Sequence, residues 1–128
     1  MQRDRQRAWR ALFWLAVALG VVLALWPQSE PKEPWLPGLD KIEHACSFAV
    51  LMWVGLRAGY RRAWVLPVGL LVLGGAIELA QSLTATRSAD WHDWLADAVG
   101  IAVTWTAARL AATGRGKHST GLEQEHSG

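Results

Sequence analysis

Residues 64–83 read WVLPVGLLVLGGAIELAQSL, and Glu78 is the one charged side chain among these twenty residues. At a rise of about 1.5 Å per residue, a helix of this length crosses the ~30 Å hydrocarbon core of a bilayer. A carboxylate inside a span costs roughly 2.5–3.5 kcal/mol at mid-depth and less near an interface. We therefore expect other polar groups to lie beside Glu78, near the end of the span that carries it.

The chain has 128 residues, which is enough for one domain, and 52% of them are hydrophobic. Its net charge of +2 is too small to suggest a nucleic-acid-binding protein, and its single Cys excludes an internal disulfide. The pattern predicts an all-α, four-helix transmembrane bundle. The apolar residues fall into four blocks, Trp9–Trp26, Lys41–Leu56, Trp64–Leu83 and Trp91–Ala112.

The first two blocks need separate arguments. The first follows several arginines and so resembles a signal peptide, but it is longer than a usual signal core and Trp26-Pro27-Gln28 is a poor cleavage site. We therefore expect an uncleaved span. The strictly apolar part of the second block, Ala45–Leu56, is short. It reaches spanning length only if the polar residues before it, from Lys41 onward, enter the membrane margin.

The basic residues predict the orientation, because Lys and Arg accumulate on the cytoplasmic side. With four spans, ten of the thirteen fall on the side that carries both termini, so both termini are predicted to be cytoplasmic. This divides the chain into a basic cytoplasmic N-terminus (1–8), a membrane domain (9–112) and a disordered polar tail (113–128). The ten are Arg3, Arg5, Arg7, Arg10, Arg57, Arg61, Arg62, Arg109, Arg115 and Lys117.

Polar residues recur at helical spacing near the opposite, outer face. Asp40 and His44 are four residues apart, and Glu78 and Gln81 are three apart, so each pair shares a helical face. The fourth block carries a continuous stripe with acidic residues near the outer face and small residues deeper in the span. Such a pattern suits a helix that turns this stripe toward protein. The stripe consists of Asp90, Asp93, Asp97, Gly100, Thr104, Ala107 and Ala111.

These residues resemble a known family, the VanZ-like membrane proteins. The resemblance covers roughly residues 40–104 and the four-span layout. Two departures concern Asp97, where many members carry Asn, and Thr104, where a second glycine is common. The matching pattern is Asp40-Lys41-x-x-His44-x-x-x-Phe48-x-x-Leu51 followed by Glu78-x-x-Gln81-x5-Arg87-x-x-Asp90-x-x-Asp93-x-x-x-Asp97-x-x-Gly100.

The resemblance implies an integral protein of the bacterial cytoplasmic (inner) membrane. The family takes its name from a protein that gives low-level resistance to teicoplanin, a lipid-tailed glycopeptide. The family has no settled biochemical activity, so the resemblance supports topology and site location more strongly than chemistry.

Three functions remain open. The protein could bind the headgroup of a lipid or lipid-tailed envelope molecule, act as an enzyme on a lipid-linked envelope precursor by acid–base or metal chemistry, or serve as a structural partner subunit. Neither a metal nor a cofactor is identified by the spacing, and a homo-oligomer or a membrane protein partner is compatible with it. The candidate catalytic residues are His44, Glu78, Asp93 and Asp97. The predicted ligand-binding residues are Asp40, Lys41, His44, Glu78, Gln81, Arg87, Asp93 and Asp97.

Each candidate also has a simpler interpretation. Glu78 with Gln81 could form an interhelical clasp, although such bonds average only about 0.6 kcal/mol in membranes. Arg87 could pair with a neighbouring aspartate or clamp a lipid phosphate. His44 could be a satisfied structural histidine. For Asp90, which precedes an apolar run, we favour an N-cap.

Overall fold

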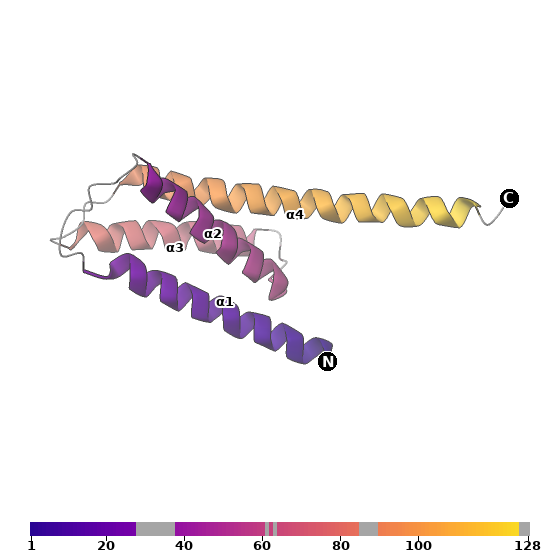
Figure 1. The fold of residues 1–128 in the computed structure, drawn as a ribbon, viewed down its shortest axis with the longest axis horizontal. Helices are drawn as coiled ribbons and strands as arrows, with labels where there is room; N and C mark the ends of the chain where they lie inside the picture. The colour runs from indigo at the N-terminus through magenta and orange to yellow at the C-terminus, as the bar shows by residue number, and fades with distance from the viewer. Residues whose placement is uncertain (28–37, 61, 63, 85–89, 126–128) are drawn as a thin grey trace.

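The computed structural model describes residues 1–27, 38–60, 62, 64–84 and 90–125, with side chains described to residue 114. Helices are the only regular secondary structure among these residues. The four helices are α1 (Gln2–Leu25), α2 (Leu39–Arg57), α3 (Val65–Ser82) and α4 (Trp91–Glu125). Each helix runs antiparallel to the one before it, so both termini lie at one end of the bundle (Figure 1).

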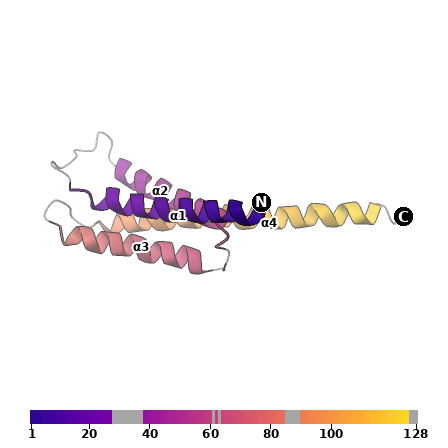
Figure 2. The ribbon, with the colours of Figure 1, turned by 90° about the horizontal axis from the view of Figure 1, so that it is seen from below.

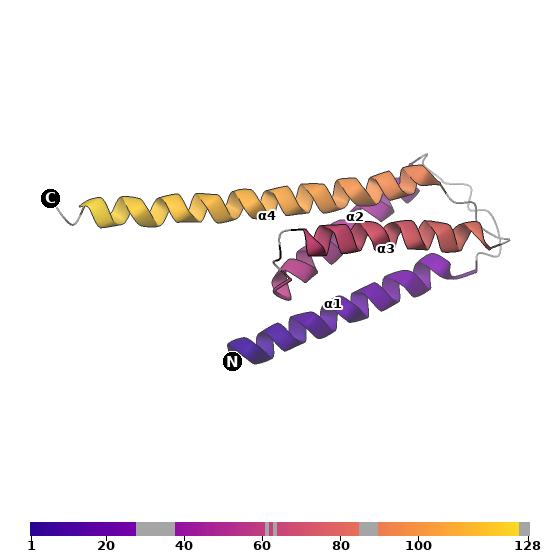
Figure 3. The same ribbon diagram turned by 180° about the vertical axis from the view of Figure 1, so that it is seen from behind.

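The packing places α2 and α3 between α1 and α4. Figures 1 and 2 together show α1 and α4 on opposite sides of the bundle. In the reverse view of Figure 3, α3 lies nearer the viewer than α2. The most extensive helix pair is α2 with α4. Gly100 makes this crossing possible, because a Cβ at this position would collide with the backbone carbonyl of Ala45.

Large apolar side chains cover the outside of the bundle rather than its centre. In α1, Phe13 is the one buried residue, whereas Trp14 and Leu15 are exposed. Val72 in α3 and Val103 in α4 are likewise exposed. An apolar surface on this scale is unusual for a soluble monomer and suits contact with lipid.

Three helices are long and apolar enough to cross a membrane: Gln2–Leu25, Val65–Ser82 and Trp91–Gly114. The second helix is not among them, since Asp40, Lys41 and Glu43 occupy its first turns. The four predicted blocks thus correspond to four helices, and three of them are candidate spans.

The fourth helix is longer than the predicted fourth block. We expected a disordered tail from Thr113, whereas α4 stays helical to Glu125. The alanines near position 112 favour helix, and no proline follows to end it. This extension carries α4 past the ends of the other helices (Figure 1). Ala107 and Ala111 are consequently exposed, so only the outer part of the predicted stripe packs against protein.

Candidate functional site

The polar residues gather at the end of the bundle opposite the termini, where α2 and α4 begin and α3 ends. His44 lies one turn into α2, and its Nδ1 is 2.9 Å from Oδ1 of Asp97. Its Nε2 faces Asp93 Oδ2 at 3.8 Å. A carboxylate accepts hydrogen bonds, so in this contact Nδ1 donates to Asp97 and Nε2 is the nitrogen that faces Asp93. His44 is therefore oriented by one aspartate toward another.

Asp97 is held in a space that Gly74 of α3 provides. The Asp97 side chain is 1% exposed, and a Cβ built on Gly74 would lie 2.6 Å from its Oδ2. The contact with His44 gives Asp97, one of the two departures from the family pattern, a hydrogen-bonding role.

This contact predicts that alanine substitution at two adjacent glycines, Gly74 and Gly75, affects the stability of the protein differently. Gly74→Ala should displace the Asp97 carboxylate and destabilise the protein by about 1–3 kcal/mol, as overpacking does in well-packed interiors. Gly75→Ala is the matched control, because its Cβ would meet Trp94 only at an ordinary 3.5 Å. Thermal unfolding in detergent, followed by tryptophan fluorescence, measures both. Equal midpoints for the two variants would contradict the proposed fit.

Glu78 joins the end of α3 to the start of α4. Its Oε2 accepts a hydrogen bond of 3.1 Å from the backbone N–H of Asp90. Its Oε1 has no partner and is buried, and the residue as a whole is 8% exposed. Among the described residues, this is the one buried side-chain polar atom left without a hydrogen bond. A buried, unpaired carboxylate oxygen is costly and calls for an explanation.

Lys41 binds three carboxylates at the outer edge of the cluster. Its Nζ lies 3.0 Å from Asp40 Oδ2, 2.9 Å from Asp90 Oδ2 and 3.0 Å from Asp93 Oδ1. These contacts join the first turn of α2 to the start of α4. They occupy the three N–H donors of the Lys41 ammonium, so none is left for Glu78.

Asp90 is confirmed as the N-cap of α4. Its Oδ1 accepts a 3.0 Å hydrogen bond from the backbone N–H of His92, two residues further on. This hydrogen bond, together with the Lys41 ammonium, holds the pKa of Asp90 well below its usual range. Its carboxylate is therefore a permanent negative charge at the rim of the site.

Two predicted ligand-binding residues, Gln81 and Arg87, are not seen among the contacts of the polar cluster in the described part of the chain. Gln81 is 3% exposed, and its Nε2 donates a 2.8 Å hydrogen bond to the Ala24 carbonyl of α1. The observed contact of Gln81 thus fastens α1 to α3. Arg87 lies outside the described residues, so its predicted binding role stays a prediction.

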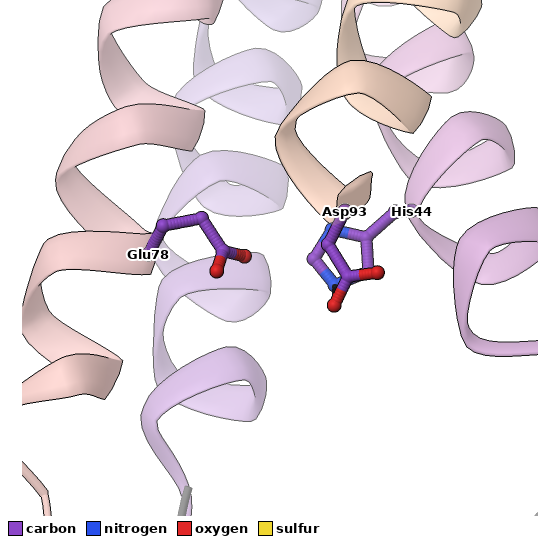
Figure 4. A group of neighbouring side chains, drawn as sticks. All are labelled: His44, Glu78 and Asp93. Carbon is purple, nitrogen blue, oxygen red and sulfur yellow. Dashed lines mark ion pairs between the residues drawn. The ribbon is translucent and has the colours of Figure 1, made fainter. Parts of the chain in front are cut away.

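The remaining candidates come together across three helices. Figure 4 shows the carboxylate of Glu78 pointing toward the neighbouring His44 and Asp93. Ligand atoms of these three residues lie within 4.8 Å of one another. Among the described residues, this cluster holds five carboxylates and one lysine, so their negative charges outnumber the lysine charge. The five carboxylates are Asp40, Glu78, Asp90, Asp93 and Asp97.

An apolar cavity of about 470 Å³ adjoins the cluster. It lies among α1, α2 and α3, and Glu43 and His44 form its polar margin. Sequence periodicity did not indicate it. Gly20 is one of its lining residues, and a Cβ added there would meet no atom within 4 Å. Its apolar lining is Val17, Gly20, Val21, Leu23, Ala24, Phe48, Leu51, Leu73 and Ile77, and Cys46 and Ser47 complete it.

Comparison with known proteins decides the family. The model of the VanZ/LLP1 family matches residues 3–112. The chain belongs to the VanZ/LLP1 family. This match, with the apolar candidate spans, makes it a multi-pass membrane protein. No curated protein and no solved structure shows significant similarity to the chain. The matched region of the VanZ/LLP1 protein includes the whole polar cluster.

Proposed function

We propose that this protein binds the polar headgroup of a lipid or lipid-linked envelope molecule at the outer face of a bacterial cytoplasmic membrane. The observation that carries the proposal is the unpartnered, buried Oε1 of Glu78, in a polar cluster whose His44 also lines an apolar cavity. A headgroup hydroxyl or amine would supply the missing hydrogen bond, and an apolar tail would occupy the cavity. A lipid-tailed glycopeptide such as teicoplanin has the same two-part chemistry.

The orientation in the membrane is part of this proposal. Arg10 and Arg57 lie at the end that carries the termini, where Arg57 stacks on the rings of Trp9 and Trp53 at 5.4 and 5.2 Å. Arginine and tryptophan together are typical of a cytoplasmic membrane boundary. This favours both termini in the cytoplasm and the polar cluster outside. The second helix then acts as a fourth span, with Lys41 reaching the outer interface.

The proposal predicts a bound molecule that depends on Glu78. In native mass spectrometry of the detergent-purified protein, the wild type should carry a discrete lipid-sized adduct that Glu78→Gln loses. The amide is isosteric but can no longer accept a second strong, charge-assisted hydrogen bond. Asp4→Asn is the charge-matched control, since Asp4 lies at the opposite end of the bundle, and should keep the adduct. Equal adducts on all three proteins, or none on a folded wild type, would favour an interhelical clasp.

A second variant tests the place of the tail. Gly20→Phe should fill the cavity without collision, because nothing lies within 4 Å of a Cβ at this position. The folded variant should lose the same adduct while every residue of the polar cluster remains. An unchanged adduct on Gly20→Phe would remove the cavity from the proposal.

An enzymatic role is a second candidate, favoured by the pairing of His44 with Asp97 at 2.9 Å. An imidazole oriented by a carboxylate, with Nε2 free, is suited to general acid–base catalysis. Release of a headgroup from the lipid found in the adduct, lost in His44→Gln, would support this role. If the lipid stays unchanged after prolonged incubation with the wild type, the enzymatic role is rejected and only the binding role is retained.

A further inference from the structure

The polar cluster has the composition and geometry of a site for a divalent cation. His44, Glu78 and Asp93 offer one imidazole nitrogen and two carboxylate oxygens, all within 4.8 Å of one another. Protein–metal bonds of about 2.0–2.6 Å place ligand atoms on opposite sides of one ion about 4–5 Å apart. The three atoms can therefore contact a common centre with small side-chain adjustments.

Two features of the cluster point to a ligand independently of its acidic composition. The Glu78 side chain is more than nine-tenths buried, and its Oε1 has no partner. Figure 4 shows this carboxylate pointing toward His44 and Asp93. The second feature is the contact of His44 Nδ1 with Asp97, which leaves Nε2 facing Asp93. Metal-binding histidines almost always use their other nitrogen in this way, because the carboxylate fixes the ring and raises its basicity.

The charge balance also favours a cation. Asp93 Oδ1 is paired with Lys41, but among the described residues Lys41 forms its ion pairs with Asp40, Asp90 and Asp93 and with neither Glu78 nor Asp97. A second acidic group, formed by Asp40, Asp90 and Asp93, is already filled by the Lys41 ammonium. Of the two groups in the described part of the chain, the inner group of His44, Glu78 and Asp93 is thus the one that has room for an ion.

We propose that His44, Glu78 and Asp93 bind a divalent metal ion, with Asp97 positioning His44. This inference rests on the proposed function but makes the ion, in place of a headgroup hydroxyl or amine, the partner of Glu78 Oε1. Three protein ligands leave coordination positions on the ion open to an anionic headgroup. Without a cation, the carboxylates in the described part of the site would repel a phosphate. With one, a lipid phosphate or pyrophosphate becomes the favoured headgroup class, since phosphate oxygens are good ligands for such ions.

Binding of Mn²⁺ alone tests the site. The detergent-purified full chain is treated with a chelator, exchanged into metal-free buffer and titrated with Mn²⁺ while the electron paramagnetic resonance signal of the free ion is recorded. We expect one Mn²⁺ per chain in the wild type. Glu78→Gln and Asp93→Asn should each weaken binding at least tenfold, and Asp4→Asn should leave it unchanged. A folded wild type that binds no Mn²⁺ would overturn the inference.

The variants also locate the ion. Glu78 belongs to the inner group alone, whereas Asp93 is shared by both acidic groups. Weaker binding in Asp93→Asn without a change in Glu78→Gln would place the ion at the Lys41 end and overturn the site as proposed. Broadening of the bound Mn²⁺ signal by histidine nitrogen, lost in His44→Gln, gives a readout that does not depend on stability.

Failure of this inference is distinguishable from failure of the proposed function. Native mass spectrometry in chelator and in Mn²⁺ reports the lipid adduct separately from the metal. A lipid adduct retained by a wild type that takes up no Mn²⁺ overturns the metal site and leaves headgroup binding intact. One Mn²⁺ per chain with no lipid adduct in either buffer supports the metal site and overturns headgroup binding.

Discussion

Gly100→Ala is expected to destabilise the bundle by about 3 kcal/mol or more, the upper range for overpacking. The added Cβ would collide with the backbone carbonyl of Ala45, and backbone cannot rotate away as a flexible side chain can. The helices must then move apart at the crossing of α2 and α4, which is the most extensive helix pair in the protein. His44, one residue before Ala45, would move away from Asp97 in consequence.

Thermal unfolding in detergent checks this prediction, with Gly69→Ala as the control. Gly69 lies within a candidate span, and a Cβ there would meet no atom within 4 Å. Its replacement should leave the midpoint unchanged or raise it, because alanine is the better helix former by about 1 kcal/mol. A Gly100→Ala protein that unfolds at the wild-type temperature would show that the two helices do not cross so closely.

The four helices could be predicted from sequence because each needs only local information. The length of each apolar block, its flanking charges and the proline-rich segment between the first two blocks can all be read directly from the sequence. The small-residue stripe of the fourth block predicted that Asp97 and Gly100 face protein, and both are buried. Ile101, which is not part of that stripe, is 3% exposed and belongs to the core. A residue next to a stripe can be buried by a second neighbouring helix, which helical periodicity does not reveal.

The candidate site was predictable as a set of residues but not as a set of contacts. Helix ends that lie at one membrane face bring polar groups together, so the convergence of His44, Glu78 and Asp93 followed from topology. The partners of Lys41 and Gln81 depend on how far each helix extends and how it is rotated. A one-residue rotation of α3 would turn Gln81 away from the Ala24 carbonyl. Such choices are settled by packing between helices and not by spacing within one.

Asp97 should tolerate Asn but not Ala. Asp97→Ala would leave the Nδ1–H of His44 without its acceptor and open a gap beside Gly74, so we expect a loss of about 2–4 kcal/mol. Asp97→Asn has the same shape, and its amide oxygen can still accept from Nδ1. The Asn variant should therefore unfold within about 1 kcal/mol of the wild type.

Thermal midpoints in detergent, with Mn²⁺ titrations on the folded variants, separate the two contributions of Asp97. If Asn preserves stability but weakens Mn²⁺ binding, the charge of Asp97 serves the ion through His44, because a neutral acceptor fixes the ring without raising its basicity. If Asn is as damaging to stability as Ala, the contact with His44 is an ion pair that the fold itself requires. Equal stability and equal Mn²⁺ binding in the wild type and both variants would contradict any positioning role, since the imidazole would then reach its place by packing alone.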